Sequence, residues 1–312
     1  MPADVLPVGL NAVLDGSISH GLEPDVAHIV QGIARASIEL AEKLRDAPLD
    51  VVPSAGSGLR EMNAAGDLQH PLDIVAHDIF LAALGSTPVQ SVLSEEAAEP
   101  IVVDMGSSLA VAIDPLDGSG NIVINAPMGT IFSIIRGCSS NDPTAAFFQS
   151  GRQVCAAGIV MYGPATVMAL SIGHGTELFV LDRRAGDFVR THTSLAIPRG
   201  TREFAINASN YRHWEPRLRV YIDDLVAGAD GPRGENFNMR WIGALVAEAY
   251  RILLRGGIFL YPSDSRDGYR NGRLRLLYEA QPVAFLVEQA GGAAIDMTGP
   301  ILDRQPSDFH ER

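Results

Sequence analysis

Apolar residues near the start of the chain recur at the spacing of a helix. Within residues 25–45 they return every three or four positions, which predicts one long amphipathic helix. The same spacing over 72–84 predicts a second helix, and the polar, glycine-bearing segment 46–71 between them predicts a long loop. Short apolar runs bounded by turn residues follow, and they predict strands at 89–93, 109–113, 130–135, 155–162, 166–172 and 177–181.

A change of pattern near residues 197–200 predicts a boundary between two domains, one over 1–198 and the other over 199–312. Gly291 stands where a glycine commonly ends a helix. The alternation of strands and helices predicts an α/β fold made of helix and sheet layers. In the second domain we expect strands at 203–206 and 256–262, the latter buried, and helices at 216–226, 238–255 and 282–290.

Composition and charge exclude several classes of protein. The 312 residues are 46% hydrophobic, so the chain can bury a large core, and at this length two domains are common. A formal charge of −13 argues against nucleic acid as a partner, because such proteins carry a basic face. No apolar run reaches the length of about 18 residues that a membrane span needs. The first residues lack the basic start of a secretory signal, so we expect a cytoplasmic protein.

Cysteine and lysine are both rare. Cys138 and Cys155 are too few for a disulfide framework, and they lack the spacing of metal ligands. Lys43 is the only lysine, so any cationic group that binds a ligand should be an arginine, whose planar guanidinium suits bidentate contacts with phosphate.

The segment AIDPLDGSGNI, residues 112–122, places two carboxylates at the end of a predicted strand. Asp114 and Asp117 can converge there with the carbonyl of Leu116 between them, and oxygen ligands of this kind suit a hard cation such as Mg²⁺. The small residues 118–120 offer backbone N–H groups that can cradle an anion. Metal and phosphate together would explain the motif. Taken alone, a plain turn in which the aspartates cap backbone N–H groups explains it equally well.

Further acids stand near the ends of other predicted elements. Glu95 and Glu96 close the strand at 89–93, Asp67 and Asp73 flank the end of the long loop, and Glu279 begins the last helix. Ligands bind where the strand ends of an α/β sheet gather, which would bring these acids to the aspartate pair. Taken singly, each is better explained as a solvated acid, a loop residue or an acid at a helix N-terminus. Spacing alone does not assemble them into one site.

Together these segments resemble the class I fructose-1,6-bisphosphatases, within the wider group of metal-dependent, lithium-sensitive sugar and inositol phosphatases. The resemblance covers nearly the whole chain and rests on the motifs GDLQHPLD, LSEE, IDPLDGSGNI, GTIFSI, AAGIVMYGPAT, GGIFLYP and GRLRLLYEAQPVAFLVEQAGG. The segments NASNYRHW and FNMRWIG resemble the bacterial form found with carbon-fixation operons. The resemblance implies a layered, two-domain sugar-phosphatase fold.

The resemblance also implies an activity and its setting. The enzyme would hydrolyse the 1-phosphate of fructose 1,6-bisphosphate with Mg²⁺, for which Mn²⁺ can substitute, in gluconeogenesis or the Calvin cycle. Sedoheptulose 1,7-bisphosphate would be a second substrate. The enzyme would be a cytoplasmic homotetramer with no nucleic-acid or membrane partner. Two alternatives are an inositol monophosphatase-like enzyme, which would leave a second phosphate pocket unexplained, and a non-catalytic regulator that binds sugar phosphate.

Site roles follow from the same resemblance, position by position. Divalent metals would be held by Glu95, Asp114, the carbonyl of Leu116, Asp117 and Glu279. Asp67 would join the metals when the loop closes, while Asp73 and Glu96 would orient and deprotonate the attacking water. The substrate would be bound by Asp117, Gly118, Ser119, Gly120, Asn207, Arg240, Tyr261, Arg273 and Arg275. Arg240 would reach in from a neighbouring subunit.

Some positions depart from the family's pattern. Arg273 stands where lysine is usual, and it keeps the charge. Trp241 replaces a tyrosine and lacks its hydroxyl, so the phosphate pocket must differ. The nucleotide site of the animal and enteric enzymes has lost recognition groups here, because its turn reads GLEP at 21–24 and its strand reads SL at 108–109. Arg136 still matches a ligand of that site, and we expect weak or no inhibition by AMP.

Overall fold

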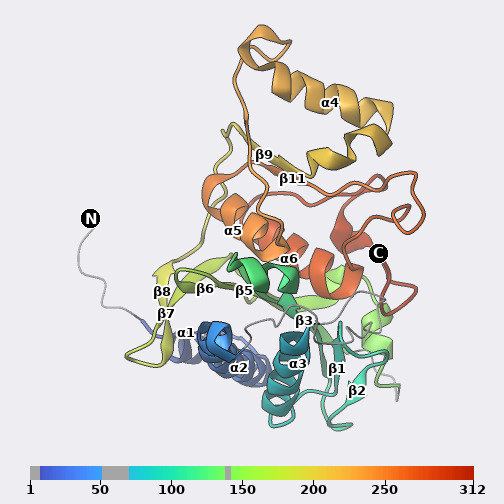
Figure 1. Ribbon diagram of the computed structural model, residues 1–312. Coiled ribbons are helices and arrows are strands. Elements are labelled where there is room, and N and C mark those ends of the chain that lie inside the picture. The colour runs from blue at the N-terminus through green and yellow to red at the C-terminus, as the bar shows by residue number, and fades with distance from the viewer. Residues whose placement is uncertain (1–7, 51–69, 138–141) are drawn as a thin grey trace.

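The computed structural model describes residues 8–50, 70–137 and 142–312, and it consists of alternating layers of helix and sheet (Figure 1). A layer of helices covers one face of a large sheet, and a second layer covers the opposite face. A small sheet and a last helix lie beyond the second layer. This arrangement confirms the expected α/β fold of layers. In the described ranges, no helix has both the length and the apolar character that crossing a bilayer requires.

The first helix layer consists of α1 (Leu10–Ile18), α2 (Pro24–Asp50) and α3 (Pro71–Leu84). The helices predicted at 25–45 and 72–84 are therefore confirmed as α2 and α3. The loop predicted to begin at residue 46 is wrong at its start, because α2 continues to Asp50, and its residues 51–69 lie outside the described residues. A proline opens each of them, and a missing N–H is harmless in the first turn of a helix. At the start of α3, His70 Nδ1 accepts the N–H of Leu72, and the carboxylate of Asp73 accepts the N–H of His70. This capping box fixes Asp73 at the N-terminal end of α3.

The large sheet has the strand order β2-β1-β3-β4-β5-β6-β7-β8. β1 and β3 are parallel, and each of the other neighbouring pairs is antiparallel. The carboxyl ends of β1 and β3 therefore lie side by side at one edge of the sheet. The strands are β1 (Ser91–Ser94), β2 (Ile101–Val102), β3 (Leu109–Asp117), β4 (Met128–Arg136), β5 (Val154–Tyr162), β6 (Thr166–Ser171), β7 (Glu177–Asp182) and β8 (Asp187–His192).

The central strands are buried on both faces, so their side chains alternate between two cores. In β3, Leu109, Val111 and Ile113 belong to the core that contains α1, α2 and α3. Ala110 and Ala112 belong to the core on the opposite face. Such strands read as continuous apolar runs, which is why the sequence pattern located them.

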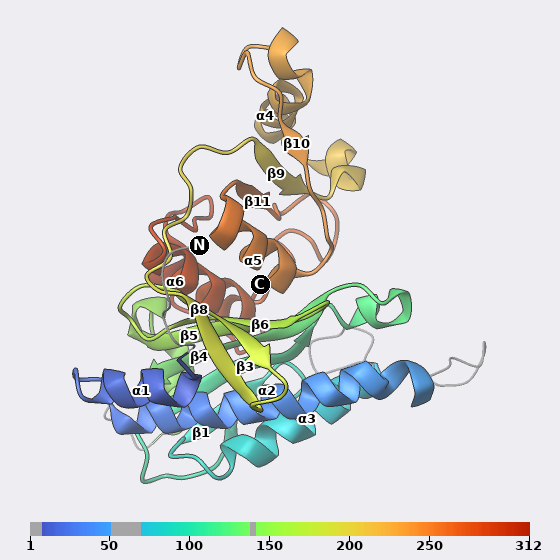
Figure 2. The same ribbon diagram turned by 90° about the vertical axis from the view of Figure 1, so that its left-hand side faces the viewer.

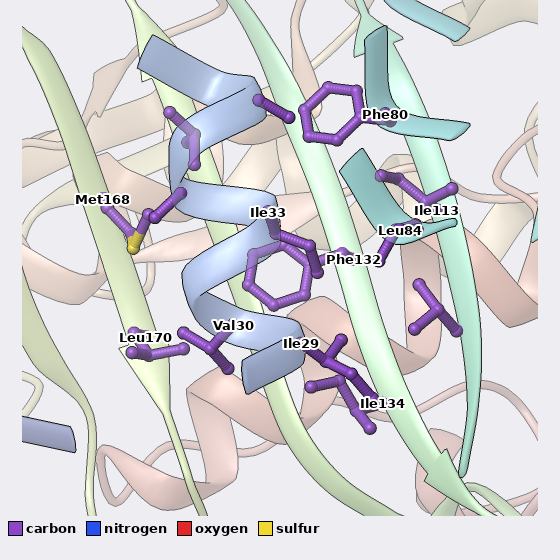
Figure 3. Packing of buried hydrophobic residues seen from close by; sticks show 14 of the residues in the cluster. Ile29, Val30, Ile33, Phe80, Leu84, Ile113, Phe132, Ile134, Met168 and Leu170 are labelled. Carbon is purple, nitrogen blue, oxygen red and sulfur yellow. The ribbon is translucent and has the colours of Figure 1, made fainter. Parts of the chain in front are cut away.

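The packing of α2 on the large sheet is tight (Figure 3). Ile29, Val30 and Ile33 of α2 share one core with Phe132 and Ile134 of β4, and all five side chains are fully buried. A core of this density anchors the strands whose ends carry the acidic residues.

The second helix layer consists of α5 (Leu245–Arg255) and α6 (Gln281–Gln289), and it covers the other face of the large sheet (Figure 2). Beyond it lies the small parallel sheet with the order β10-β9-β11, followed by α4 (Pro216–Ala227). Its strands are β9 (Glu203–Ile206), β10 (Asn238–Met239) and β11 (Ile258–Leu260). Phe204, Ile206, Trp214, Ile222 and Leu225 form its separate small core.

Two predictions for the second part of the chain are wrong. The helix expected at 238–255 begins only at Leu245, because residues 238–239 pair with β9 and Gly243 takes a left-handed φ of 81°. The strand expected at 256–262 as a buried run shrinks to β11, which is partly exposed because it forms an edge of the small sheet.

Other elements were missed or cut short. The pattern did not indicate α1, β2 or β8, whose apolar positions are few or interrupted by charged residues. The strand expected to end at residue 113 continues as β3 to Asp117 through an irregular register. The acidic motif is therefore part of the strand and not a loop after it.

Candidate active site

The parallel pairing of β1 with β3 brings the first acids together. Ser94 lies beside Ile113 in the register, so Glu95, just after the end of β1, and Asp114, still within β3, lie side by side at the same edge of the sheet. The N–H of Glu95 donates to the carbonyl of Ile113 at 3.0 Å. Strand pairing thus unites carboxylates that are 19 positions apart in the sequence.

An irregularity in β3 shapes the aspartate motif. The register with β4 shifts between Asp114 and Asp117, and Thr130 Oγ1 of β4 donates to the carbonyl of Pro115 at 2.9 Å. Asp114 Oδ1 accepts the N–H of Leu116 at 3.0 Å. These bonds fold the motif tightly, as a β-bulge does, and keep Leu116 between the two acids.

Glu279 completes a cluster of three carboxylates. It lies in the π-helical turn Leu276–Ala280 that precedes α6, and not at the start of that helix as the sequence suggested. Ligand oxygens of Asp114, Asp117 and Glu279 all lie within 4.8 Å of one another. Asp117 Oδ2 also accepts the N–H of Val246 at 2.9 Å, which ties the cluster to the first turn of α5.

Burial raises the pKa of these acids. The pKa of Glu95 rises to about 7, and that of Asp117 rises to about 6, with burial the largest cause in both. The pKa of Asp114 and that of Glu279 are raised well above their ordinary values by burial and then by the neighbouring carboxylates. Negative charge gathered in this way lacks a sufficient counter-charge within the protein.

Arg275 supplies part of that counter-charge. Its side chain is only 3% exposed, and Nη2 lies 3.9 Å from Glu95 Oε1. Its backbone N–H donates to the carboxylate of Glu279. One guanidinium cannot balance four buried carboxylates, so the site favours a divalent cation.

The donor set fits such a cation. Oxygen ligands from several carboxylates are the preference of Mg²⁺ and other hard divalent ions. Asp114, Asp117 and Glu279 present that set, and Glu95 adds a fourth carboxylate beside it. The backbone of Leu116 is held next to this set, because its N–H donates to Asp114 Oδ1. No histidine or cysteine belongs to the carboxylate group found among the described residues.

Asp73 and Glu96 lie at the ends of elements that meet this edge. Asp73 is 4% exposed, and burial raises the pKa of its carboxyl group. Hydrogen bonds from the His70 N–H and the Ser119 hydroxyl lower this pKa, but by less than burial raises it. Glu96 follows Glu95 directly, and its N–H donates to Ser94 Oγ at 3.3 Å. A raised pKa makes the carboxylate of Asp73 a stronger base for proton transfer. Asp67 lies outside the described residues.

The small residues after the motif form an open turn. Gly118 has a left-handed φ of 76° and opens the 3₁₀ helix Ser119–Ile124. A Cβ at Gly118 would come within 3.0 Å of the Cβ of Ala244, whereas one at Gly120 would meet no atom within 4 Å. The backbone is therefore approachable at Gly120, as the anion cradle predicted from the sequence requires.

One cavity of about 180 Å³ joins the carboxylates to an aromatic and cationic wall. The acids Glu95, Asp117 and Glu279 line one part of it, and Tyr261 and Arg273 line another. Trp241, Phe259 and Tyr261 contact one another in this wall, with ring centroids 5.8 to 6.0 Å apart. Arg275 also lines the cavity.

Asn207 and Arg240 are placed less directly. Asn207 follows β9 and Tyr261 follows β11, and because Ile206 lies beside Leu260 in the register, both residues leave the small sheet at the same edge. Asn207 Oδ1 caps the next turn by accepting the N–H of Ser209 at 3.2 Å. Arg240 is 52% exposed, and its Nε lies 3.5 Å from Glu203 of the same chain. Neither residue lines the cavity.

Sequence reasoning missed the contribution of α5. Its first turn holds Asp117, and Glu248 Oε1 accepts the N–H of Ile242 at 2.7 Å, which fixes the segment that carries Trp241. Because we expected the helix to begin at residue 238, the sequence did not indicate a helix N-terminus at Leu245. The available signal was Gly243, because a glycine just before an amphipathic run can mark the point where a helix begins.

Comparison with known proteins places the chain in a family. A profile described as fructose-1-6-bisphosphatase, N-terminal domain, matches residues 15–193, and the profile of the C-terminal domain matches residues 197–312. The chain belongs to the fructose-1,6-bisphosphatase family. This confirms the resemblance, and it makes the chain a phosphoric monoester hydrolase rather than a non-catalytic regulator.

Individual fructose-1,6-bisphosphatases agree with this assignment. The class 1 enzymes of Sinorhizobium medicae and Rhizobium meliloti are each 48% identical to this chain, over 97% of it and 87% of their own length. The crystal structure of the Leishmania major enzyme in holo form is 33% identical and superposes with a TM-score of 0.89. That match covers 98% of this chain and 94% of the Leishmania chain.

Proposed function

We propose that this chain hydrolyses the 1-phosphate of fructose 1,6-bisphosphate and releases fructose 6-phosphate and phosphate. One observation carries the proposal: a single cavity has a carboxylate cluster in one part and Tyr261 with Arg273 in another. Such a cavity suits a substrate with two phosphates, one at the reacting end and one remote from it. Membership of the family supports the same substrate and disfavours an inositol monophosphatase-like activity.

The metal would be held by Glu95, Asp114, Asp117, Glu279 and the carbonyl of Leu116. Their oxygen-only character supports Mg²⁺, with Mn²⁺ as a substitute. When bound, such ions neutralise charge on the phosphoryl oxygens and make water a better nucleophile.

The remaining residues at the reacting end would position water and phosphate. Asp73 and Glu96, with Asp67, would orient the attacking water and take its proton. The backbone N–H groups of residues 118–120 would bind the phosphate that leaves, and Arg275 would lie beside it. Phosphoryl transfer requires above all that the attacking water and the leaving oxygen lie in line with the phosphorus atom.

Tyr261, Arg273 and Asn207 would bind the remote phosphate, and Arg240 would reach it from a neighbouring subunit of a homotetramer. Arginines can supply local positive charge in a protein whose net charge is −13. We further propose that the chain divides into domains near residue 198, acts in the cytoplasm in gluconeogenesis or the Calvin cycle, and also accepts sedoheptulose 1,7-bisphosphate.

The test is phosphate release from a panel of sugar phosphates, measured with Mg²⁺, with Mn²⁺ and with EDTA. Fructose 1,6-bisphosphate should be turned over with either metal and not with EDTA, while inositol 1-phosphate and fructose 6-phosphate should be poor substrates. Equal rates on inositol 1-phosphate and the bisphosphate would overturn the proposed substrate.

A further inference from the structure

Two guanidinium groups contact the ring of Tyr269, and one of them, that of Arg273, lines the cavity. The Cζ atom of Arg266 lies 3.9 Å from the centroid of the Tyr269 ring, and that of Arg273 lies 4.7 Å from it. Both distances are within the range of a cation–π contact. Only Arg273 of these three residues lines the cavity.

The first guanidinium is rigidly held. Arg266 Nε and Nη2 both donate to the carboxylate of Asp264, with the shortest contact at 2.5 Å. The side chain of Asp264 is 2% exposed, and the pKa of this carboxyl group is lowered to about 2 by its bonds with Arg266. Bidentate pairs of this kind restrict the arginine to one orientation.

The backbone of Tyr269 is held as well. Its N–H donates to the carbonyl of Arg266 at 3.1 Å, and its carbonyl accepts the N–H groups of Asp264 and Gly272 at 3.0 and 3.1 Å. The position of Tyr269 is therefore restricted both by the contact of its ring with Arg266 and by its backbone hydrogen bonds. A fixed ring can in turn restrict the guanidinium of Arg273.

A guanidinium benefits from such a ring more than an ammonium does. It is planar and weakly hydrated, so it stacks on an aromatic face, whereas a lysine ammonium is a compact and strongly hydrated charge. The stack gives a physical reason for arginine at position 273, where the resemblance leads one to expect lysine. It also holds the fork of Arg273 in one orientation, as bidentate contact with a phosphate requires.

We propose that Tyr269 is a positioning residue that orients Arg273 toward the remote phosphate of the substrate. The inference rests on the proposed function, because it assumes a substrate with a phosphate at that end of the cavity. Its role is to reduce the conformational freedom of Arg273 before the substrate binds, which strengthens binding without touching the reacting atoms.

The experiment compares Tyr269→Leu with Tyr269→Phe, which keeps the ring, by steady-state kinetics on fructose 1,6-bisphosphate. A partly exposed cation–π contact corresponds to roughly a fivefold change in an equilibrium constant. Tyr269→Leu should therefore raise KM about fivefold and leave kcat within about twofold. Tyr269→Phe should keep KM near the wild-type value.

Two controls separate positioning from a general structural effect. Tyr221→Leu removes a comparable contact, with Arg233 Cζ at 4.8 Å from the ring of Tyr221, away from the cavity, and it should leave KM unchanged. In an Arg273→Lys background, Tyr269→Leu should change KM less than about twofold, because the group that it orients is gone. Hydrolysis of fructose 1-phosphate, which lacks the remote phosphate, should have the same KM in Tyr269→Leu and wild type.

The outcomes are distinguishable. Normal wild-type turnover with an unchanged KM in Tyr269→Leu would overturn the positioning role alone. An equal rise of KM for the bisphosphate and for fructose 1-phosphate would also overturn it. Absence of wild-type turnover on fructose 1,6-bisphosphate would instead overturn the proposed function, and the positioning role with it.

Discussion

Asp117 Oδ2 accepts the backbone N–H of Val246 at 2.9 Å. The bond joins the irregular end of β3 to the first turn of α5, two segments that are 129 residues apart. A carboxylate at a helix N-terminus is stabilised by the exposed N–H groups there. This hydrogen bond can hold the Asp117 side chain in place without a metal, beside the carboxylates of Asp114 and Glu279.

Asp117→Asn should keep the fold and lose most of the activity. The amide oxygen can still accept the N–H of Val246, but a neutral amide is a poor ligand for a hard cation. We expect turnover to fall roughly a thousandfold, because metal-derived stabilisation is worth several kcal/mol. Phosphate release at saturating Mg²⁺ measures the loss. Asp78→Asn makes the same change at an exposed carboxylate and should be active; a fully active Asp117→Asn enzyme would refute the metal assignment.

The metal-free protein should lose stability as the pH rises from about 4 to 7. Glu95 has an ordinary pKa of 4.5 that folding raises to about 7, and Asp117 has one of 3.8 that folding raises to about 6. Between the ordinary and the raised pKa of each group, the folded state binds more protons than the unfolded state. The free energy of unfolding therefore falls as the pH rises through this range. The two shifts together correspond to a loss of about 6 kcal/mol.

Urea denaturation in EDTA at pH 5 and pH 7.5 measures this effect, and a repeat in excess Mg²⁺ is the control. Bound metal replaces the protons, so Mg²⁺ should restore most of the stability at pH 7.5. A metal-free protein that is more stable at pH 7.5 than at pH 5 would contradict the raised pKa values.

Phe132→Ala should destabilise the protein by about 3–5 kcal/mol, because it removes a fully buried ring at the centre of the core under α2 and leaves a cavity. Val226→Ala, at a side chain that is 72% exposed, should change the free energy of unfolding by less than about 0.5 kcal/mol. The denaturant midpoints of the two variants measure these changes in stability. Similar midpoints for the two would mean that this core does not carry the fold.

AMP should inhibit weakly or not at all. Arg136, the residue that still matches the nucleotide site of the family, forms an ion pair with the carboxylate of Glu23. That carboxylate would repel a nucleotide phosphate, and each missing charge-assisted hydrogen bond weakens binding by about 1.5–3 kcal/mol. Titration of activity with AMP at saturating Mg²⁺ is the measurement. Half-inhibition at a low micromolar concentration of AMP would contradict the prediction of weak inhibition.

Much of the fold was predictable from the sequence because the central strands are buried on both faces. The largely apolar runs at residues 109–113 and 130–135 are typical of strands that are covered by helices on both faces of a sheet. β8 escaped prediction for the opposite reason, since it lies at an edge and carries exposed polar residues. The local hydrophobic pattern indicates which strands are buried, but it says little about strands at the edge of a sheet.

The site was predictable in part. The spacing of Asp114 and Asp117 indicated a metal, but the meeting with Glu279 depends on how a turn before α6 packs against β3, which no local pattern encodes. The contact of Tyr269 with Arg266 and Arg273 was missed for a similar reason, because it depends on the path of an irregular segment. Tertiary packing decides such meetings.

We propose that the carboxylate end of the cavity cleaves one particular phosphate of the substrate while Tyr261 and Arg273 bind the other. Identification of the sugar product by ³¹P NMR after a single round of hydrolysis of fructose 1,6-bisphosphate with Mg²⁺ tests it most directly. We expect fructose 6-phosphate and inorganic phosphate in equal amounts. Fructose 1-phosphate as the product, or an undiminished rate of fructose 6-phosphate formation by the Asp117→Asn variant, would contradict it.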